Sequence, residues 1–298
     1  MKNSPLIFDI RRGSFDNGPG IRTTVFFKGC PLRCVWCHNP ESMESCRELA
    51  FYPEHCLKCG ECFKVCPSQA ITLEGNLRIN RTKCNLCADC AKICPAGALK
   101  VVGQYYPVNK LLELLLRDKV FYQVSGGGVT FSGGEPLLFI NYLSEIIQAL
   151  KQEKIHTAIQ TAGYFSFPEF AAKILPYLDL VMFDLKIYDS AKHKYYTGYG
   201  NKVILDNFTR LPAGKVSVIP RVPLIPNITA VPENLIRIAE FLRKHSCRNY
   251  SLLPFNPGGI SKWERLGKDI PGKLRDSKLE PAREEQWREL FEKTIQLR

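Results

Sequence analysis

The sequence of 298 residues predicts an α/β protein whose parallel sheet is interrupted by a cysteine-rich segment. Six short apolar segments alternate with stretches of helical periodicity, which is the pattern of a parallel sheet. The apolar segments show little polar–apolar alternation, as is typical of strands buried on both faces. The cysteine-rich segment, residues 47–102, lies inside this alternation. We expect the sheet to be either open or closed part of the way into a barrel.

The expected strands are rich in β-branched and aromatic residues. They are Thr23–Phe27, Val129–Phe131, His156–Gln160, Leu180–Asp184, Val216–Arg221 and Tyr250–Pro254. The expected helices are Leu137–Gln152, Pro168–Leu178, Val203–Leu211, Pro232–Lys244 and Glu280–Gln296. Two of them begin with proline, which the first helical turn tolerates because an N–H there has no helical partner. Inside the cysteine-rich segment, short β-like pieces are expected at Ala70–Leu73 and Ala98–Val102.

Eleven of the 13 cysteines fall into three groups with short spacings. The first group has the spacing Cys-x3-Cys-x2-Cys and consists of Cys30, Cys34 and Cys37. The other two share the spacing Cys-x2-Cys-x2-Cys-x3-Cys-Pro and consist of Cys56, Cys59, Cys62 and Cys66, then Cys84, Cys87, Cys90 and Cys94. This run is typical of bacterial proteins that hold a pair of [4Fe–4S] clusters, each run's fourth cysteine ligating the other cluster. The first group offers only three thiolates, so a cubane bound there leaves one iron open.

Disulfides and zinc are the alternatives to iron–sulfur clusters. Disulfides need an oxidising compartment, and the N-terminal residues have no apolar core of the kind that directs export. Zinc knuckles are usually separated by a long spacer, whereas each run here places four thiols within 11 residues. Zinc stays open as the alternative for these two runs. Cys46 and Cys247 fit no ligand spacing and are expected to be ordinary thiols.

The net charge of +12 admits a nucleic-acid partner, but the basic residues are dispersed. No run of five or more Lys or Arg occurs, and thiolate clusters would lower the net charge. A mildly basic surface suits an acidic protein partner equally well. No apolar stretch is long enough to span a bilayer. We therefore expect a cytoplasmic protein with no nucleic-acid or membrane partner.

Unusual residues follow the expected strands at the points where the strands end. They are the loop with Cys30, Cys34 and Cys37, then Gly133 to Pro136, Gln160, Asp184 with Lys186, Arg221, and Asn256. In barrels and open sheets, active sites form at the carboxyl ends of parallel strands. We expect these residues to meet in one site.

The longer strings around these residues resemble a known family. The strings are Asp16-Asn17-Gly18-Pro19-Gly20-Ile21-Arg22, Gly29-Cys30-Pro31-Leu32-Arg33-Cys34-Val35-Trp36-Cys37-His38-Asn39-Pro40, Ser132-Gly133-Gly134-Glu135-Pro136 and Met182-Phe183-Asp184-Leu185-Lys186. Together they resemble the radical S-adenosylmethionine (SAM) superfamily, and within it the activating enzymes of glycyl radical enzymes. The cysteine-rich insertion resembles that of the larger members of this group.

The resemblance implies a partial (β/α)6 TIM-like barrel, residues 1–46 and 103–298, with an inserted two-cluster ferredoxin domain at residues 47–102. It implies reductive cleavage of SAM to methionine and a 5′-deoxyadenosyl radical, which removes a hydrogen atom from a backbone glycine of a partner glycyl radical enzyme. Three [4Fe–4S] clusters are expected. The inserted pair is expected either to pass on electrons from a flavodoxin or ferredoxin or to shape the docking surface.

The resemblance also implies roles for single residues. Cys30, Cys34 and Cys37 would hold the SAM-binding cluster, and Lys186 would meet the SAM carboxylate. The methionine amino group would lie against Gly133, Gly134, Glu135 and Pro136, and Trp36 would flank the cluster and the adenine. Asp184, Gln160, Thr161 and the Met182 carbonyl fall where the simplest activase pattern has a monovalent-cation site. Arg221 and Asn256 are further cofactor-binding candidates.

Two residues depart from that simplest pattern. Gln160 stands where the pattern has an aspartate, and Asn256 stands where it has a histidine near the SAM. Two other functions stay open at this point. One is a radical SAM maturase acting on another peptide or a small molecule, and the other is a zinc-binding nucleic-acid module with an appended α/β domain.

Overall fold

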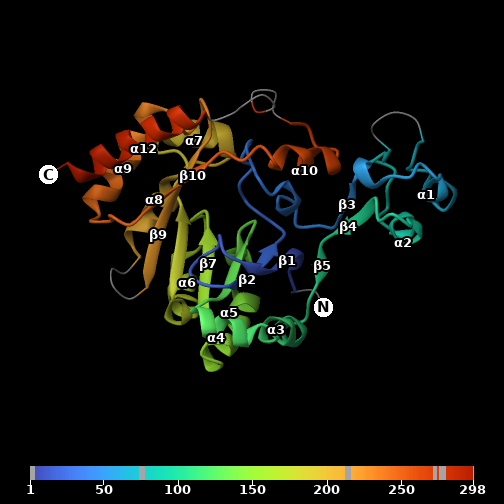
Figure 1. Ribbon diagram of the computed structural model, residues 1–298, viewed down its shortest axis with the longest axis horizontal. Helices are drawn as coiled ribbons and strands as arrows, with labels where there is room; N and C mark the ends of the chain where they lie inside the picture. The colour runs from blue at the N-terminus through green and yellow to red at the C-terminus, as the bar shows by residue number, and fades with distance from the viewer. Residues whose placement is uncertain (1–3, 74–77, 212–215, 271–273, 275–279, 298) are drawn as a thin grey trace.

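A single large sheet organises the computed structural model, which describes residues 4–73, 78–211, 216–270, 274 and 280–297 (Figure 1). The strand order in this eight-stranded sheet is β10-β9-β8-β7-β6-β2-β1-β5. The bounds are β1 Leu6–Ser14, β2 Arg22–Phe27, β5 Gln104–Tyr105, β6 Gly128–Gly133, β7 His156–Thr161, β8 Leu180–Asp184, β9 Ser217–Leu224 and β10 Ser251–Pro254.

Six of these strands, β2 and β6 to β10, pair in parallel and in the order of the chain. Each crossover therefore joins neighbouring strands, as in a (β/α) barrel and unlike a doubly wound sheet, where the order reverses. Among the described residues the run is unclosed, because β10 ends the strand order and β2 pairs with β1 instead of with β10. All six expected strands and the α/β class with a mostly parallel sheet are confirmed.

Two antiparallel edge strands were not expected from the sequence. β1 pairs antiparallel with β2, and β5 adds two residues to its other side. The charged residues Asp9, Arg11 and Arg12 give β1 a polar character that hides it from a search for buried strands. β5 is too short to show any pattern.

The helices cover the sheet and complete the core. They are α3 Val108–Leu116, α4 Lys119–Ser125, α5 Ile140–Gln152, α6 Phe167–Lys173, α7 Ser190–Thr197, α8 Lys202–Thr209, α9 Pro232–Lys244, α10 Gly259–Arg265 and α12 Pro281–Gln296. The five expected helices correspond to α5, α6, α8, α9 and α12, and two of them carry 3-10 turns, η3 Pro136–Phe139 and η4 Leu175–Tyr177. Fully buried side chains such as Phe131, Leu143 and Phe183 fill the space between sheet and helices. No helix in the described part of the chain is long and apolar enough to cross a membrane.

The cysteine-rich segment stands to one side of the sheet (Figure 1). Its base is a separate antiparallel pair, β3 Glu48–Phe51 with β4 Leu99–Val102. Beyond the base it has the 3-10 turn η2 Pro53–His55 and two single-turn helices, α1 Glu61–Lys64 and α2 Asp89–Ile93. The expected piece at Ala98–Val102 contains β4, whereas Ala70–Leu73 makes only an isolated bridge, Ile71 to Ile79. Its buried apolar cluster is small, and cysteine thiols adjoin it.

Candidate active site

A cavity of about 320 Å³ opens at the carboxyl ends of the six parallel strands. Its lining comes from the carboxyl-terminal parts of the strands and from the loops that follow them. The expected site residues on this lining are Cys30, Cys34, Trp36, Cys37, Gly133, Gly134, Gln160, Asp184, Lys186, Arg221 and Asn256. Glu135 and Pro136 are buried behind the lining. One rim therefore brings together residues that lie more than 200 positions apart in the chain.

The cysteine loop follows β2 and is held by backbone hydrogen bonds. Gly29 has a φ of 105° where the chain leaves the strand, and its N–H donates to the Ser42 carbonyl at 2.7 Å. The Arg33 N–H donates to the Thr197 carbonyl at 2.7 Å, so the end of α7 supports the middle of the loop. These contacts fix the backbone from which the loop presents its thiols.

The three thiols of this loop lie in an apolar setting. Burial raises the pKa of Cys34 to about 12, although the nearby Lys186 ammonium acts in the opposite direction. Burial also raises the pKa values of Cys30 and Cys37. Iron must therefore displace tightly held protons, and binding is coupled to their release.

Glycine is required where the loop after β6 meets β2. Gly133 has a φ of 104°, and a Cβ there would lie 2.4 Å from the Phe27 nitrogen. A Cβ on Gly134 would lie 2.1 Å from the Gly29 carbonyl oxygen. The backbone N–H groups of Gly134 and Glu135 donate to the carbonyls of Phe27 and Gly29, both at 2.9 Å. These contacts set this glycine loop directly beside the start of the cysteine loop.

Glu135 fastens this arrangement to the end of β7. Its carboxylate accepts from the Thr161 hydroxyl at 2.8 Å and from the Ala162 N–H at 2.9 Å. The side chain has no exposed area, and burial raises the pKa of Glu135 to about 7. Glu135 thus holds the cavity wall together, and its carboxyl group is not on the lining.

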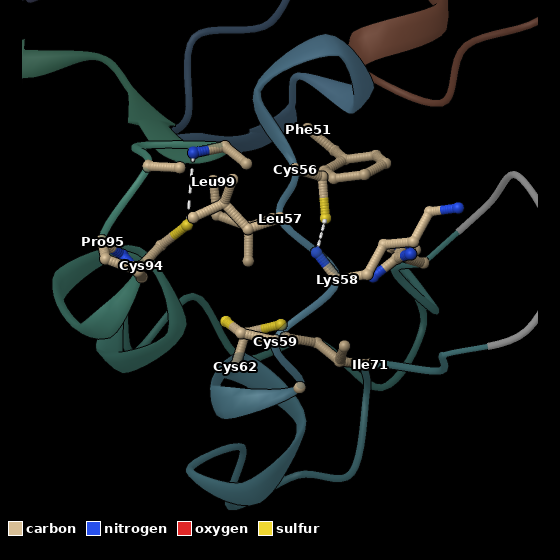
Figure 2. A pocket seen from close by; sticks show the side chains of 14 residues that line it. Phe51, Cys56, Leu57, Lys58, Cys59, Cys62, Ile71, Cys94, Pro95 and Leu99 are labelled. Atoms are coloured by element: carbon tan, nitrogen blue, oxygen red, sulfur yellow. Dashed lines mark hydrogen bonds between the residues drawn. The ribbon is translucent and has the colours of Figure 1, made fainter.

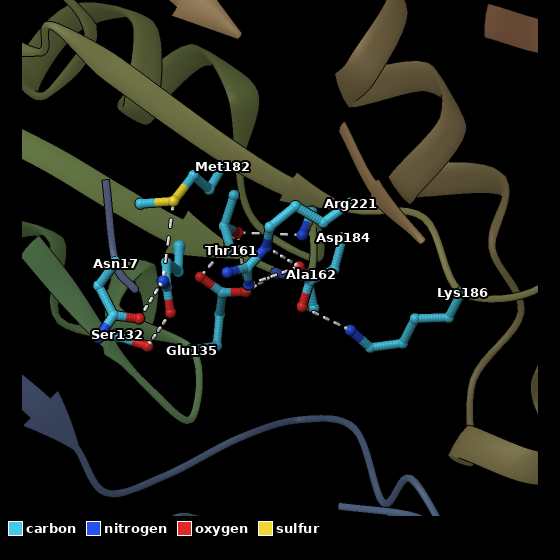
Figure 3. Close-up of polar contacts among 11 residues, drawn as sticks. Asn17, Ser132, Glu135, Thr161, Ala162, Met182, Asp184, Lys186 and Arg221 are labelled. Atoms are coloured by element: carbon cyan, nitrogen blue, oxygen red, sulfur yellow. Dashed lines mark hydrogen bonds and ion pairs between the residues drawn. The ribbon is translucent and has the colours of Figure 1, made fainter. Parts of the chain in front are cut away.

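Asp184 is the hub of a charged cluster on the cavity lining (Figure 3). It accepts from Lys186 Nζ at 2.9 Å and from Arg221 Nε at 2.8 Å. Burial alone would raise the pKa of Asp184, but Arg221 and Lys186 outweigh it and hold this pKa below the usual value. Burial disfavours the Lys186 ammonium, but Asp184 and the Cys34 thiol hold the pKa of Lys186 above its usual value. Asp184 therefore keeps the Lys186 ammonium charged beside the cysteine loop.

Gln160 forms hydrogen bonds with two other side chains, those of Asn17 and Ser132. Its Nε2 donates to Asn17 Oδ1 at 2.8 Å, and its Oε1 accepts from the Ser132 hydroxyl. Of the other expected cation ligands, Asp184 is paired with two cations and the Thr161 hydroxyl donates to Glu135. The monovalent-cation site stays a prediction.

Two further aromatic and amide candidates have identifiable neighbours. Trp36 is 9% exposed, and its ring centroid lies 6.3 Å from that of Tyr196. Asn256 Oδ1 accepts from the Gly258 N–H at 2.8 Å, so this residue also shapes the turn before α10.

The eight remaining grouped cysteines line two small cavities in the cysteine-rich segment. Cys56, Cys59, Cys62 and Cys94 line one of them (Figure 2). Cys66, Cys84, Cys87 and Cys90 line the other. Each cavity thus receives three thiols from one run and the fourth thiol of the other run. Backbone N–H groups point at some of the sulfurs, for example Ala98 to Cys94 Sγ at 3.2 Å.

Comparison with known proteins places this geometry in a family. The model of the radical SAM superfamily matches residues 24–244. The benzylsuccinate synthase activating enzyme of Thauera aromatica is 40% identical over 272 residues, covering 89% of this chain and 82% of that protein. The chain belongs to the radical SAM superfamily. Within it, the chain is an activating enzyme of the glycyl radical enzymes.

Other relatives of this radical SAM activating enzyme carry the same kind of name. The trans-4-hydroxy-L-proline dehydratase activating enzyme of Clostridioides difficile is 38% identical, covering 90% of each chain. Among solved structures, a domain of pyruvate-formate lyase-activating enzyme from Bacteroides vulgatus aligns with a TM-score of 0.47 and 27% identity. That alignment covers 57% of this chain and 95% of the solved one.

The residues of the cavity fit the cofactors that the radical SAM family uses, SAM and a SAM-binding [4Fe–4S] cluster. Cys30, Cys34 and Cys37 supply three sulfur donors, which is one fewer than a four-iron cubane accepts. The cavity beside them is lined by the backbone of Gly133 and Gly134 and by the Lys186 ammonium. Polar backbone groups suit the amino group of an amino-acid ligand such as the methionyl part of SAM, and a cation suits its carboxylate. When bound, the cluster supplies the electron that cleaves SAM.

Sequence reasoning missed two residues that shape this radical SAM site. Asn17 fixes Gln160 from the segment before β2, and Trp263 Nε1 donates to the Cys37 carbonyl at 2.9 Å from α10. Asn17 lies within the Asp16 to Arg22 string, but the string assigned no role to this residue. Nothing in the pattern around Trp263 separates it from an ordinary packed tryptophan.

Proposed function

We propose that this activating enzyme performs its chemistry in the cavity at the carboxyl ends of the parallel strands, with Cys30, Cys34 and Cys37 as the cluster ligands. One electron cleaves the sulfonium–C5′ bond of SAM, giving methionine and a 5′-deoxyadenosyl radical. That radical takes a hydrogen atom from a backbone glycine of the partner, which leaves 5′-deoxyadenosine and a glycyl radical. The observation that carries the site assignment is the convergence of six strand-end loops on one cavity beside the three thiols.

Lys186 and the glycine loop have complementary tasks in this proposal. The Lys186 ammonium is kept charged by Asp184 and is placed to meet the SAM carboxylate. Gly133 and Gly134 have no side chain, so their backbone packs closely against neighbouring backbone and lines the cavity. Backbone carbonyl groups there would accept hydrogen bonds from the methionyl amino group. Arg221 also pairs with Asp184, so the cluster contains two cations and one carboxylate. Its net positive charge would attract the SAM carboxylate.

The test of the site is a pair of cysteine variants in anaerobically reconstituted protein. Cys34→Ala removes one proposed ligand, and Cys247→Ala removes a thiol that lies outside all three groups. With dithionite, we expect no 5′-deoxyadenosine from Cys34→Ala and normal formation from Cys247→Ala. Formation by Cys34→Ala at the normal rate would refute the assignment.

We further propose that residues 47–102 form a ferredoxin-like domain inserted into a partial barrel made of residues 1–46 and 103–298. The separate β3–β4 base and the two thiol-lined cavities support this division. Each cavity would hold one [4Fe–4S] cluster, which would add to the small apolar cluster of the insertion. The clusters would pass electrons from a flavodoxin or ferredoxin to the SAM site.

Iron analysis and a protein donor test this second proposal. Wild type should carry about 12 irons and Cys56→Ala about 8 or fewer. Activation driven by reduced flavodoxin should fall in Cys56→Ala and stay unchanged in Cys46→Ala, whose thiol is exposed and ungrouped. Normal flavodoxin-driven activation after loss of the inserted iron would exclude electron relay and leave docking as the role of the insertion.

The glycyl radical enzyme that serves as partner is proposed only as a class. The relatives activate a benzylsuccinate synthase, a choline trimethylamine-lyase and a trans-4-hydroxy-L-proline dehydratase, with 38% to 40% identity to this chain. Identities so similar give no preference among them. Incubation with candidate partners should produce a glycyl doublet in the electron paramagnetic resonance spectrum of the true partner alone.

A further inference from the structure

The short helix α10 lies between the cysteine loop and the insertion (Figure 1). Its side chains and the turn that follows contact both parts. These contacts lie outside the wall that Lys186, Asp184 and Arg221 form. α10 has seven residues, too few to be stable alone, so its position depends on what holds it at each end.

On one side, α10 holds the third cysteine of the loop. Trp263 Nε1 donates to the Cys37 carbonyl at 2.9 Å, and Lys262 Nζ donates to Asn39 Oδ1 at 2.9 Å. A Cβ on Gly259 would lie 3.0 Å from His38 Cα, so the helix approaches the loop backbone closely. The peptide plane after Cys37 is therefore fixed by α10, and with it the direction of the Cys37 side chain.

On the other side, α10 is anchored to the insertion. The Arg265 guanidinium pairs with Glu54 at 2.6 Å and lies 4.7 Å from the ring centroid of Tyr52. The Arg265 carbonyl accepts from Arg81 at 3.3 Å. Glu54 stands two residues before Cys56, and Arg81 stands three residues before Cys84. Both cysteine runs of the insertion are thus close in sequence to an anchor of the same helix.

We propose that α10 couples the insertion to the SAM site, with Trp263 as the positioning residue for Cys37 and Arg265 as the residue that positions α10 on the insertion. This inference rests on the proposed function, because it takes Cys37 as a cluster ligand and the insertion as an iron-binding domain. Loss of the Arg265 guanidinium removes the ion pair and the ring contact that hold this end of α10 on the insertion. The end then keeps the Arg81 hydrogen bond to the Arg265 carbonyl and the contacts of Leu266 and Lys268 but is held less firmly, so the hydrogen bond to Cys37 weakens. The arrangement keeps a constant separation between the insertion and the site that it would supply with electrons.

Hydrogen exchange of the iron-loaded protein tests the coupling. Arg265→Gln removes the guanidinium, whose partners in the described part of the chain are Glu54 and the Tyr52 ring. The matched control is Arg237→Gln, because Arg237 also lies over a tyrosine ring, at 4.6 Å, and near a carboxylate, at 3.8 Å. We expect amides of residues 37–42 to exchange about fivefold faster in Arg265→Gln, and at the normal rate in the control.

Trp263→Phe gives the second measurement. It keeps the ring and removes the N–H donor, so residues 37–42 should again exchange about fivefold faster. Trp287→Phe, in α12, is its control and should change nothing there. The reduced spectrum of the SAM-binding cluster should shift in Trp263→Phe and keep its wild-type form in Trp287→Phe, because only the former releases a ligand residue.

Two results separate failure of this inference from failure of the proposed function. Faster exchange in Arg265→Gln confined to the insertion, with residues 37–42 unchanged, would overturn the coupling while leaving the iron content intact. A wild-type protein with only about 4 irons would instead overturn the ferredoxin-like insertion, whatever the exchange rates. If Arg265→Gln does not fold, Arg265→Lys keeps the charge for Glu54 but loses the planar stack, and should accelerate exchange by a smaller factor.

Discussion

Glu48→Gln is predicted to destabilise the protein strongly, because Glu48 is the counter-charge of a fully buried lysine. Lys28 Nζ donates to Glu48 Oε2 at 2.8 Å, and the Lys28 side chain has no exposed area. The other oxygen of Glu48 pairs with Lys268 at 2.9 Å. Lys28 follows β2 in the main sheet and Glu48 begins β3, so the pair joins the sheet to the insertion.

The magnitude follows from the burial of the charges. Removing one partner of a buried ion pair costs about 3–5 kcal/mol, because the other charge is left uncompensated. Lys28 still donates to the Glu41 carbonyl, and Glu48 is 13% exposed, so we expect the low end, about 3 kcal/mol. Lys28→Met should cost less, about 1–2 kcal/mol, because Glu48 keeps Lys268 and methionine fills much of the space.

The assay is denaturant-induced unfolding of the iron-loaded protein, followed by tryptophan fluorescence under anaerobic conditions. Glu113→Gln is the matched control, since Glu113 also contacts two cations, Lys110 at 3.0 Å and Arg117 at 3.1 Å, but is 53% exposed. Its loss should cost much less than the loss of Glu48, because solvent screens exposed ion pairs. The double variant Lys28→Met with Glu48→Gln should be more stable than Glu48→Gln alone. Equal costs for Glu48→Gln and Glu113→Gln would refute the reasoning.

Two other predictions concern packing and pH. Gly259→Val should displace α10 and lower the iron content of the cysteine loop, because even a Cβ at this position would lie 3.0 Å from His38 Cα. Ser261→Val in the same helix is the control. Equal iron content in the two variants would contradict the close approach. Hydrogen bonds from Arg12, and to a smaller extent from Thr23, hold the pKa of Asp118 below its usual value. The stability that Asp118 contributes is therefore present above about pH 4 and is lost as the pH falls through the lowered pKa. Asp118→Asn should therefore be less stable than wild type near neutral pH, and the difference in unfolding free energy should narrow as the pH falls below about 4. A difference independent of pH would contradict this.

The sequence predicted the strands of the sheet well because their signal is local. Leu180–Asp184 reads as a buried strand from its own five residues, and the structure places β8 over the same span. Similarly, the three cysteine groups are visible from spacing alone. The strand β1 was missed because its own charged residues, such as Asp9 and Arg11, look unlike a buried strand, and only its pairing with β2 reveals it.

The contacts that join distant segments could not be derived in the same way. Asp184 with Lys186 was visible as a pair two residues apart, but its pairing with Arg221 depends on the neighbouring strands β8 and β9. Likewise, Gln160 was recognised as a departure from a pattern, and only the folded chain supplies Asn17 as its partner.

The sequence by itself determined the class of fold, the family and the thiols available for iron, because periodicity, motif strings and cysteine spacing are properties of short stretches of chain. Tertiary structure alone decided how these parts are joined. It placed Trp263 against Cys37, 226 residues away, and Arg265 against Glu54, 211 residues away. Such contacts form only when separate elements pack against each other. Because the two partners are far apart in the chain, the contact produces no periodicity or short motif that could be recognised in the sequence.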